Sequence, residues 1–333
     1  MKSRLVAVMV AALLGAALPC VAAAADPPPT PMPIGTIQVR ASSVACPASD
    51  ETCLGFSVAC PGLANNAIGT MSIGAPINTA ARGVVAMFSG AGGQGFFPSA
   101  GKNTLVRNLR KGGLETIRIA WAAGWWYSAA NERAGDNVLA CRPATLLRYL
   151  YDTYYVPMGL THSQGICGFC VAGESGGTDQ AAYPMSVYGE SSFIDALVLV
   201  SGPTHAELAK ACLGRAGDEA YWYASSSAGK ADMAYGFRAG YGPCTLKDPA
   251  YESEFLRDGI DTGGYNLGFP TTRIDMLIGG QDTTPAPAHA RAWLALVQAA
   301  GTPDTRVVLV GNMGHQLGGT GVAQFQQLLL LRG

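Results

Sequence analysis

The amino-acid sequence predicts an α/β fold, in which a mostly parallel central sheet carries helices on both faces. From Gly83 onward, short apolar runs alternate with longer amphipathic stretches, a pattern typical of parallel strands joined by helical crossovers. Hydrophobic residues make up 49% of the 333 residues, and 43 are glycine. These numbers indicate a large core and many tight turns.

The expected elements follow this alternation along the chain. Three short apolar runs before Gly83 suit an antiparallel edge of the sheet, at residues 37–40, 56–59 and 68–73. The later strands are expected at residues 84–88, 116–121, 166–172, 194–200, 274–278 and 307–310. Helices are expected at residues 103–111, 143–155, from about 176, 285–299 and 322–331.

One stretch interrupts the alternation of strands and helices. Residues 201–271 contain no run long enough to join the sheet, and we expect a lid insertion at about 204–270 that shapes a substrate pocket. The alternative is that its aromatic residues form a small core of their own. These aromatic residues are Tyr221, Trp222, Tyr223, Tyr235, Phe237, Tyr241, Tyr251, Phe255, Tyr265 and Phe269.

The first 25 residues have the pattern of a secretory signal peptide. Lys2 and Arg4 precede an apolar run over residues 5–18, and small residues end at Ala25, where cleavage is expected. An uncleaved membrane anchor and a lipid-anchored Cys20 are the alternatives. The sequence therefore predicts a secreted or periplasmic protein: signal peptide 1–25, a proline-rich leader with the edge strands over 26–82, and the main unit over 83–333.

Cysteine usage agrees with export. Eight cysteines follow Cys20, enough for up to four disulfides, and Cys212 with Cys244 is the pairing that we expect within the insertion. Cys167 and Cys170 fall in the expected strand 166–172, where side chains three apart point to opposite faces, so they should not bridge each other. We interpret this pair as structural rather than as a redox or metal site.

The charge balance excludes two classes of protein. The chain has 22 Lys and Arg against 23 Asp and Glu, and only 14% of its residues are charged. Disordered chains combine low hydrophobicity with high net charge, and nucleic-acid binders need a basic surface. We therefore expect a folded protein with no nucleic-acid partner.

A candidate nucleophile stands at Ser175. Residues 173–177 read Gly-Glu-Ser-Gly-Gly and fit G-x-S-x-G between an expected buried strand and an expected helix. Glycines permit the sharp turn that exposes the serine hydroxyl, and the N–H of Gly176 would lie beside the nucleophile. In a glycine-rich chain the motif alone could be an ordinary turn, but its position between strand and helix favours a nucleophile.

A serine nucleophile needs a base, and four histidines are available. His315 follows the expected strand 307–310, at the carboxyl edge of the sheet where sites form in open α/β folds. His162 precedes the nucleophile strand and should lie at the opposite edge, while His289 in a helix is expected on the surface. His205, at the correct edge but within the insertion, is the second candidate.

Asp282 is the candidate carboxylate that would orient the base. It follows the expected strand 274–278 at the same edge as His315. Asp195 and Asp275 lie at the starts of strands, and Asp179 lies in the helix after Ser175. The chain order serine, aspartate, histidine is that of one known class of catalytic triad.

With these residues in place, the chain resembles the α/β-hydrolase family of serine esterases and lipases. The resemblance covers roughly residues 68–331 and rests on GESGG, IGGQD, MGH and the FSGAGGQG segment after the strand 84–88. It implies an oxyanion hole made by the N–H groups of Ala91 and Gly176, with Gly90 or Gly92 as alternatives to Ala91.

Two positions depart from the family pattern. Ser89 stands where a histidine is often found, which leaves the backbone role of its loop intact. Pro184 falls inside the expected helix after Ser175 and should end or kink it, because proline lacks the backbone N–H.

The resemblance implies a secreted serine hydrolase that cleaves a small-molecule or polymeric carboxylic ester through an acyl-enzyme. We expect no cofactor, no metal and no stable membrane insertion after signal cleavage. A serine peptidase of the prolyl-oligopeptidase type and a catalytically silent binding protein are the alternatives. Aromatic residues over 121–127, with those of the insertion, favour an apolar or aromatic substrate group, although packing alone could explain them.

Overall fold

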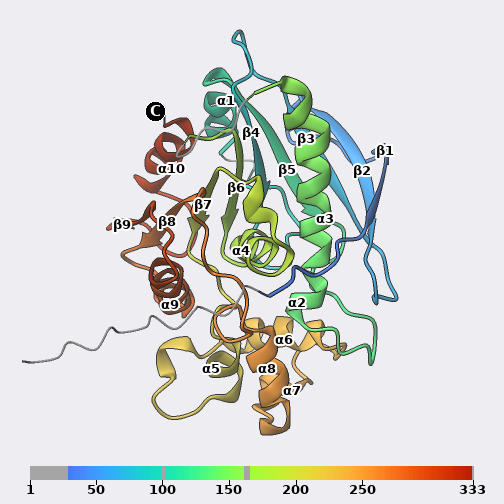
Figure 1. Cartoon of the computed structure of the whole chain (residues 1–333), viewed down its shortest axis with the longest axis vertical. Helices are drawn as coiled ribbons and strands as arrows, with labels where there is room; N and C mark the ends of the chain where they lie inside the picture. Colours follow the sequence, from blue (N-terminus) through green and yellow to red (C-terminus); the bar gives the residue numbers. More distant parts are fainter. Residues whose placement is uncertain (1–28, 100–101, 161–165, 332–333) are drawn as a thin grey trace, which may run out of the picture.

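The computed structural model describes residues 29–99, 102–160 and 166–331, and these residues form a nine-stranded sheet flanked by helices (Figure 1). The strand order is β1-β2-β3-β5-β4-β6-β7-β8-β9. The strands are β1 (Thr36–Ala41), β2 (Thr52–Ala59), β3 (Ala67–Gly74), β4 (Gly83–Phe88), β5 (Leu114–Trp121), β6 (Phe169–Glu174), β7 (Ala196–Val200), β8 (Arg273–Gly279) and β9 (Thr305–Val310). The expected signal peptide and His162 lie outside the described residues.

The sheet is antiparallel at one side and parallel through the rest, which confirms the predicted architecture. Strands β1, β2, β3 and β5 pair in antiparallel fashion, whereas β5, β4, β6, β7, β8 and β9 all run parallel to their neighbours. The parallel strands therefore bring their carboxyl ends to one common edge.

Helices cover both faces of the sheet (Figure 1). The longer helices of the core are α1 (Asn103–Lys111), α3 (Cys141–Leu150), α4 (Gly176–Tyr188), α9 (Ala286–Ala299) and α10 (Gly321–Leu330), and a four-residue helix, α2 (Asp136–Leu139), precedes α3. Apolar residues of α3, α4 and α9 join one hydrophobic cluster, and those of α1 and α10 join another.

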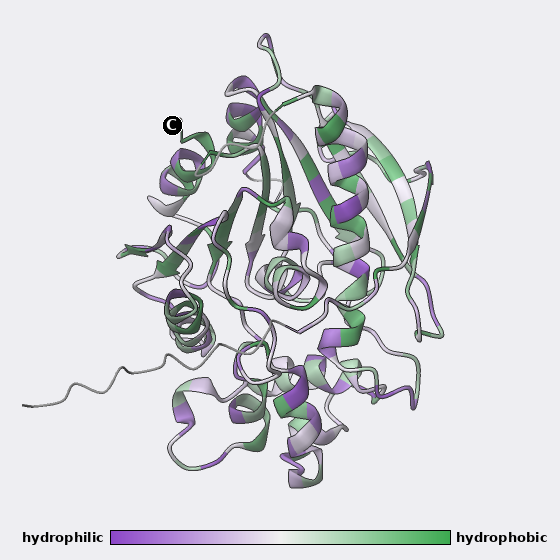
Figure 2. Ribbon diagram, in the orientation of Figure 1, coloured by the Kyte–Doolittle hydropathy of each residue, from purple (hydrophilic) through white to green (hydrophobic). Residues whose placement is uncertain are grey.

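Strand β4 shows why the central strands are apolar throughout. All six of its residues are buried. Val84, Ala86 and Phe88 belong to one hydrophobic cluster, while Val85 and Met87 belong to the other. Since alternate side chains point to opposite faces, a strand covered by helices on both sides needs apolar residues at every position. Figure 2 shows much of the central sheet in green.

The segment between β7 and β8 folds into its own group of helices, which Figure 1 shows gathered at one end of the sheet. They are α5 (Leu208–Leu213), α6 (Ser225–Ala234), α7 (Pro243–Leu246) and α8 (Glu252–Asp258). A disulfide between Cys212 and Cys244 joins α5 to α7, as expected from the sequence. We refer to residues 201–271 as the insertion.

The prediction that Cys167 and Cys170 do not bridge each other is wrong. Strand β6 begins at Phe169, so Cys167 precedes the strand and the alternation of side chains does not apply to it. The two residues form a disulfide with their Cα atoms 5.4 Å apart. The other bridges in the described residues join Cys46 to Cys53 and Cys60 to Cys141.

Helix α4 does not end at Pro184, which was one of the two effects expected of this proline. Pro184 lies inside it, and the helix continues to Tyr188 rather than ending at the proline. Its end is set by Gly189, which adopts the left-handed conformation with φ 73°. Every residue of α4 is buried, so tertiary packing outweighs the cost of one missing backbone hydrogen bond.

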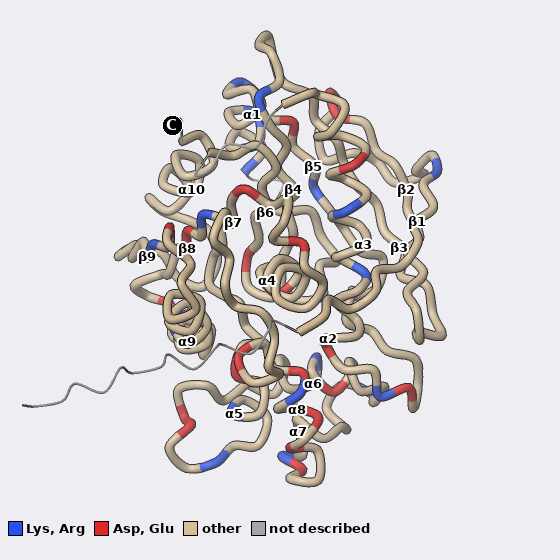
Figure 3. The backbone as a smooth tube through the Cα atoms, viewed as in Figure 1, with Lys and Arg blue, Asp and Glu red and all other residues tan. Residues whose placement is uncertain are grey.

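Charged residues are sparse and mixed over the fold. Figure 3 shows basic positions dispersed among acidic ones rather than collected on one element. None of the helices in the described residues is both long and apolar enough to span a bilayer.

Candidate active site

Ser175 occupies a strained turn between β6 and α4. Its backbone has φ 53° and ψ −129°, a region that L residues other than glycine rarely adopt. The turn brings the chain very close to β4, because a Cβ atom added at Gly177 would stand 2.4 Å from the carbonyl oxygen of Phe88. A side chain at Gly177 would therefore clash with β4. The turn places the side chain of Ser175 at the carboxyl edge of the sheet.

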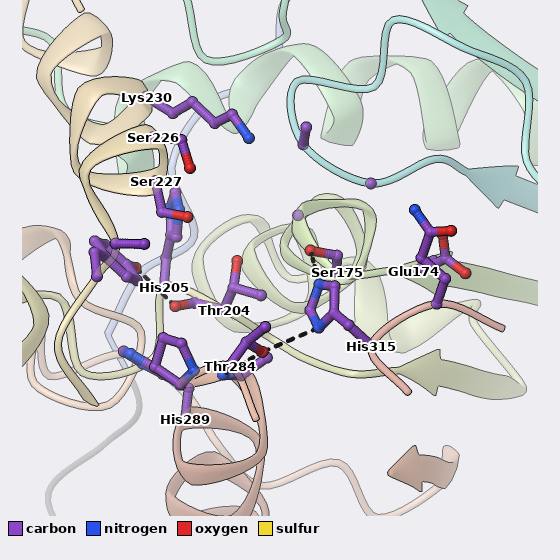
Figure 4. A pocket seen from close by; sticks show the side chains of 18 of the residues that line it. Glu174, Ser175, Thr204, His205, Ser226, Ser227, Lys230, Thr284, His289 and His315 are labelled. Atoms are coloured by element: carbon purple, nitrogen blue, oxygen red, sulfur yellow. Dashed lines mark hydrogen bonds between the residues drawn. The ribbon is translucent and has the colours of Figure 1, made fainter. Parts of the chain in front are cut away.

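The structure brings the three sequence-predicted residues together. Nε2 of His315 lies 2.8 Å from Oγ of Ser175, and Nδ1 of His315 lies 3.0 Å from Oδ2 of Asp282 (Figure 4). His315 comes from the loop after β9 and Asp282 from the loop after β8. An ionised carboxylate only accepts hydrogen bonds, so Nδ1 carries the proton and the Nε2 lone pair faces the serine hydroxyl.

A fourth residue, Thr284, completes the environment of Asp282. Its backbone N–H and its hydroxyl both donate to Oδ1 of Asp282, at 3.0 and 2.7 Å. Burial raises the pKa of Asp282, but the hydrogen bonds from His315 and Thr284 outweigh it and leave the pKa below its ordinary value. The carboxylate is therefore held ionised and oriented. Sequence analysis did not single out Thr284.

The loop that carries His315 is tied to its neighbours. The carboxylate of Glu174, the residue before the serine, accepts the N–H of Leu317 at 2.5 Å. Burial raises the pKa of Glu174. The N–H of Gln281 donates to the carbonyl of Met313 at 2.9 Å, which joins the loop of Asp282 to the loop of His315. The two loops are thus fixed relative to each other and to the turn between β6 and α4 that carries Ser175.

The loop after β4 lies against the start of α4. Ala91 has φ 51°, and a Cβ atom at Gly176 would meet the carbonyl of Ala91 at 2.5 Å. The N–H of Gly93 donates to the carbonyl of Gly90, and the carbonyl of Gly93 accepts from Trp121. Within the described residues, the N–H groups of Ala91 and Gly176 have no acceptor, so both are available to a ligand beside Ser175.

Neither His205 nor His289 is hydrogen-bonded to Ser175 in the part of the chain that the structure describes. His205 is buried, and its Nδ1 lies 2.8 Å from Oδ2 of Asp136. His289 was expected on the surface, and that prediction is wrong because the insertion covers its face of α9. The ring of His289 is fully buried and stacks on Tyr223.

The environment of His289 keeps it neutral. Its Nδ1 accepts the N–H of Glu207, so the proton lies on Nε2 and faces the carbonyl of Tyr221. Burial lowers the pKa of His289 to about 3. This histidine therefore joins the insertion to α9 and is not a proton carrier at neutral pH.

The three other aspartates considered in the sequence analysis have hydrogen-bond or ion-pair partners away from His315. Asp179 is fully buried and accepts three hydrogen bonds, from the N–H and hydroxyl of Thr204 and from the N–H of His205. Asp195 accepts the N–H of Phe169, and Asp275 pairs with Arg273. Asp195 and Asp275 lie at the starts of strands, as the sequence predicted.

A cavity of about 880 Å³ opens over Ser175. The insertion contributes Trp222 and Tyr223 to its wall, whereas Tyr235 and Phe255 are fully buried and pack on each other. The aromatic residues of the insertion are therefore divided between the cavity and a local core. Within the described residues, no group of three or more His, Cys, Asp or Glu side chains is arranged to hold a metal ion.

Comparisons with solved structures agree on the fold. An esterase of the hyperthermophilic archaeon Pyrobaculum calidifontis is 14% identical and aligns over 89% of this chain and 86% of its own, with a TM-score of 0.51. A thermostable carboxylesterase from a metagenomic library is 16% identical over 86% of this chain and 91% of its own, with a TM-score of 0.50.

Acetyl xylan esterase 1 of Thermoanaerobacterium sp. JW/SL YS485 is 11% identical over 89% of this chain and 87% of its own, with a TM-score of 0.51. No protein-family model and no curated protein sequence matches the chain. The protein has the α/β-hydrolase fold that the sequence motifs predicted.

Proposed function

We propose that the protein is an exported serine hydrolase that cleaves carboxylic esters. The observation that carries this proposal is the hydrogen-bonded series Ser175, His315 and Asp282 at the wall of an 880 Å³ cavity. A hydroxyl beside an imidazole lone pair, with a carboxylate behind the imidazole, is the arrangement that activates serine as a nucleophile.

The proposed reaction proceeds in two halves. Oγ of Ser175 attacks the ester carbonyl while Nε2 of His315 takes the hydroxyl proton, and Asp282 stabilises the imidazolium. The tetrahedral intermediate collapses, the imidazolium gives its proton to the departing alcohol, and an acyl-serine remains. Water then attacks the acyl-serine with His315 as the base, which releases the acid and restores the serine.

The negative charge on the carbonyl oxygen would be stabilised by two backbone donors. The free N–H groups of Ala91 and Gly176 border the cavity on the side of Ser175. Gly176 is also the first residue of α4, whose N-terminus carries the positive end of the helix dipole. Loss of one such donor costs on the order of 100-fold in turnover.

Two observations favour an ester over a peptide substrate. Three solved structures that share this fold at a TM-score of 0.50 or more are named as esterases. The cavity is bounded by side chains of the insertion, including Trp222 and Tyr223, which suits a compact ester with an apolar or aromatic group. We propose that the insertion acts as the lid of this cavity.

A direct test uses the purified chain from residue 26 with p-nitrophenyl acetate and p-nitrophenyl butyrate. We expect turnover of both esters and a loss of about 10⁴-fold or more in Ser175→Ala, because removal of the nucleophile leaves only binding and oxyanion stabilisation. Ser253→Ala, an exposed serine of α8, is the matched control and should keep full activity. Equal activity in Ser175→Ala and Ser253→Ala would contradict the proposal.

Substrate class is tested by comparing an ester with the matching amide. A p-nitrophenyl ester and a p-nitroanilide with the same acyl group differ only in the leaving atom. The proposal predicts preference for the ester beyond the difference in chemical reactivity, whereas a peptidase of the prolyl-oligopeptidase type would turn over the anilide of a prolyl peptide efficiently.

A further inference from the structure

The cavity over Ser175 has a cationic side that the proposed ester hydrolysis does not use. Lys230, Ser226 and Ser227 of α6 line the cavity together with His205, and Figure 4 shows the Lys230 side chain extending into it from the side of the insertion. Ser175 and His315 stand on the opposite side in the same view. A substrate held by the triad therefore faces these groups.

Lys230 forms no ion pair with the residues that the structure describes. It is half-buried, and within the described residues no carboxylate lies at ion-pair distance from it. Residues four apart share one face of a helix, so Lys230 stands above Ser226 on α6. A partly desolvated ammonium group without a counter-ion favours a negatively charged ligand.

The start of α6 adds donors to the same place. Helix α6 runs over Ser225–Ala234 and has no side-chain cap. Ser227 donates its N–H to the carbonyl of Ala224, but the N–H groups of Ser225 and Ser226 have no acceptor in the described residues. Free N–H groups at the positive end of a helix attract anions.

His205 supplies an independent observation. Its side chain is 5% exposed and borders the cavity, and Nδ1 is engaged by Asp136 at 2.8 Å. The other ring nitrogen has no protein partner among the described residues. The ring is stacked on Trp126, with the ring centres 5.4 Å apart. A buried imidazole fixed in this way presents one N–H donor to the cavity.

The carboxylates near His205 do not cancel the positive charge on this side of the cavity. Desolvation lowers the pKa of His205, but Asp136 and Asp179 outweigh it and raise the pKa to about 9. Neither carboxylate lines the cavity, and Asp179 is saturated by Thr204 and His205. Among the described residues that line the cavity, Glu174 is the one acidic residue; it stands beyond His315 in Figure 4 and accepts the N–H of Leu317.

We propose that the preferred substrates are esters that carry a carboxylate, and that Lys230, Ser226 and the N–H groups at the start of α6 bind this carboxylate while His205 donates to it from the adjoining wall. This inference rests on the proposed function, because it names the substrate class of the same site. Lys230 then determines specificity and takes no part in the acyl transfer.

The test compares matched esters. Monoethyl adipate and ethyl hexanoate differ by a carboxylate on the acyl side, while 4-(butanoyloxy)butanoate and butyl butyrate differ by a carboxylate on the alcohol side. We expect kcat/KM to be about tenfold or more higher for one or both anionic esters than for the neutral partner. The pair of esters that shows the preference tells whether the acyl half or the alcohol half of the substrate reaches Lys230.

Lys230→Met should lower kcat/KM for the preferred anionic ester by about tenfold, mainly through KM, and leave the neutral ester unchanged. Lys230→Arg should restore most of the preference, and Ser226→Ala should weaken it less. Lys111→Met, which removes an exposed cation at the end of α1, is the control for net charge. Raising the salt concentration should reduce the preference in the wild type but not in Lys230→Met.

Failure of this inference is distinct from failure of the proposed function. Hydrolysis of the neutral esters with no preference for either anionic ester, or a preference that survives in Lys230→Met, overturns the inference and leaves the ester hydrolase standing. If no ester is turned over, calorimetric titration of each anionic ester, monoethyl adipate and 4-(butanoyloxy)butanoate, into Ser175→Ala decides. Binding of either ester that weakens in Ser175→Ala/Lys230→Met supports the cationic subsite, and absent binding of both, or binding that is equal in the two variants, contradicts it.

Discussion

At the scale of single residues, the sequence predicted the three side chains that lie together at Ser175 better than it predicted their surroundings. Ser175 lies in a motif with a physical reason for each glycine, and Asp282 and His315 follow strands that end at the same edge. Thr284 was missed because a threonine two residues after an aspartate is a common local turn, and only the structure places its hydroxyl between Asp282 and His315. His289 was misjudged because the sequence does not show which helix face the insertion covers.

Thr284 is expected to act as a positioning residue for Asp282. Thr284→Val removes the hydroxyl donor, so the pKa of Asp282 should rise toward its ordinary value and kcat should fall by about tenfold. The acid limb of the kcat/KM profile should move to higher pH as well. Thr284→Ser keeps the donor and should restore both parameters. A Thr284→Val profile that matches the wild type would remove Thr284 from this role.

His205 should make stability depend on alkaline pH. Its pKa is about 9 in the folded protein against 6.5 for an ordinary histidine, so its stabilising contribution is complete below pH 6.5 and is lost as the pH rises through 9. Urea unfolding at pH 6.5, 8 and 9.5 should show a decline in the free energy of unfolding that is smaller in His205→Gln. Parallel declines in the two proteins would assign the pH dependence to other groups.

At the scale of secondary-structure elements, alternation of apolar runs predicted the order and type of the core elements. Their ends were harder to place, because β6 begins at Phe169 and not at 166, and this difference reversed the prediction for Cys167 and Cys170. Pro184 was expected to end or kink α4, yet the buried helix continues through it to Tyr188. At Pro184 the packing of a fully buried helix outweighs the local preference of proline.

The elbow between β6 and α4 should tolerate no side chain at Gly177. In Gly177→Ala the new Cβ atom would stand 2.4 Å from the carbonyl of Phe88, so we expect a loss of about 1–3 kcal/mol in the free energy of unfolding. A shift of Ser175 by about 1 Å would cost on the order of 100-fold in kcat.

Gly311→Ala is the control, because no atom lies within 4 Å of a Cβ atom at Gly311. Urea unfolding and ester turnover should separate the two variants. Equal behaviour of Gly177→Ala and Gly311→Ala would show that close contact does not set the geometry of the elbow.

At the scale of the whole molecule, the sequence predicted a mostly parallel sheet with helices on both faces but not how the helices of the insertion gather at one end of the sheet (Figure 1). The cavity brings Lys230, His205 and Trp222 of the insertion to the same place as Ser175 and His315, which lie far from them in the chain. Neither hydrophobic periodicity nor motif spacing reports such contacts. This is why the proposed catalytic residues could be predicted from the sequence while the proposed carboxylate subsite could not.

Export of the protein predicts the mass and the cysteine oxidation state of the whole chain. We propose that the protein is secreted or periplasmic, and its disulfides between Cys46 and Cys53, Cys60 and Cys141, Cys167 and Cys170, and Cys212 and Cys244 suit an oxidising compartment. Intact-mass spectrometry of the exported protein should give a chain that begins at Asp26 with no free thiol. A retained signal segment or alkylatable cysteines in the unreduced protein would contradict this assignment.

The central claim is that Ser175 is a nucleophile activated by His315. The most direct measurement is peptide mapping by mass spectrometry after treatment with a fluorophosphonate, which phosphonylates activated serines. We predict one adduct per chain, located on Ser175, absent in Ser175→Ala and strongly slowed in His315→Ala. An unlabelled wild-type protein, or an adduct that persists in Ser175→Ala, would contradict the account.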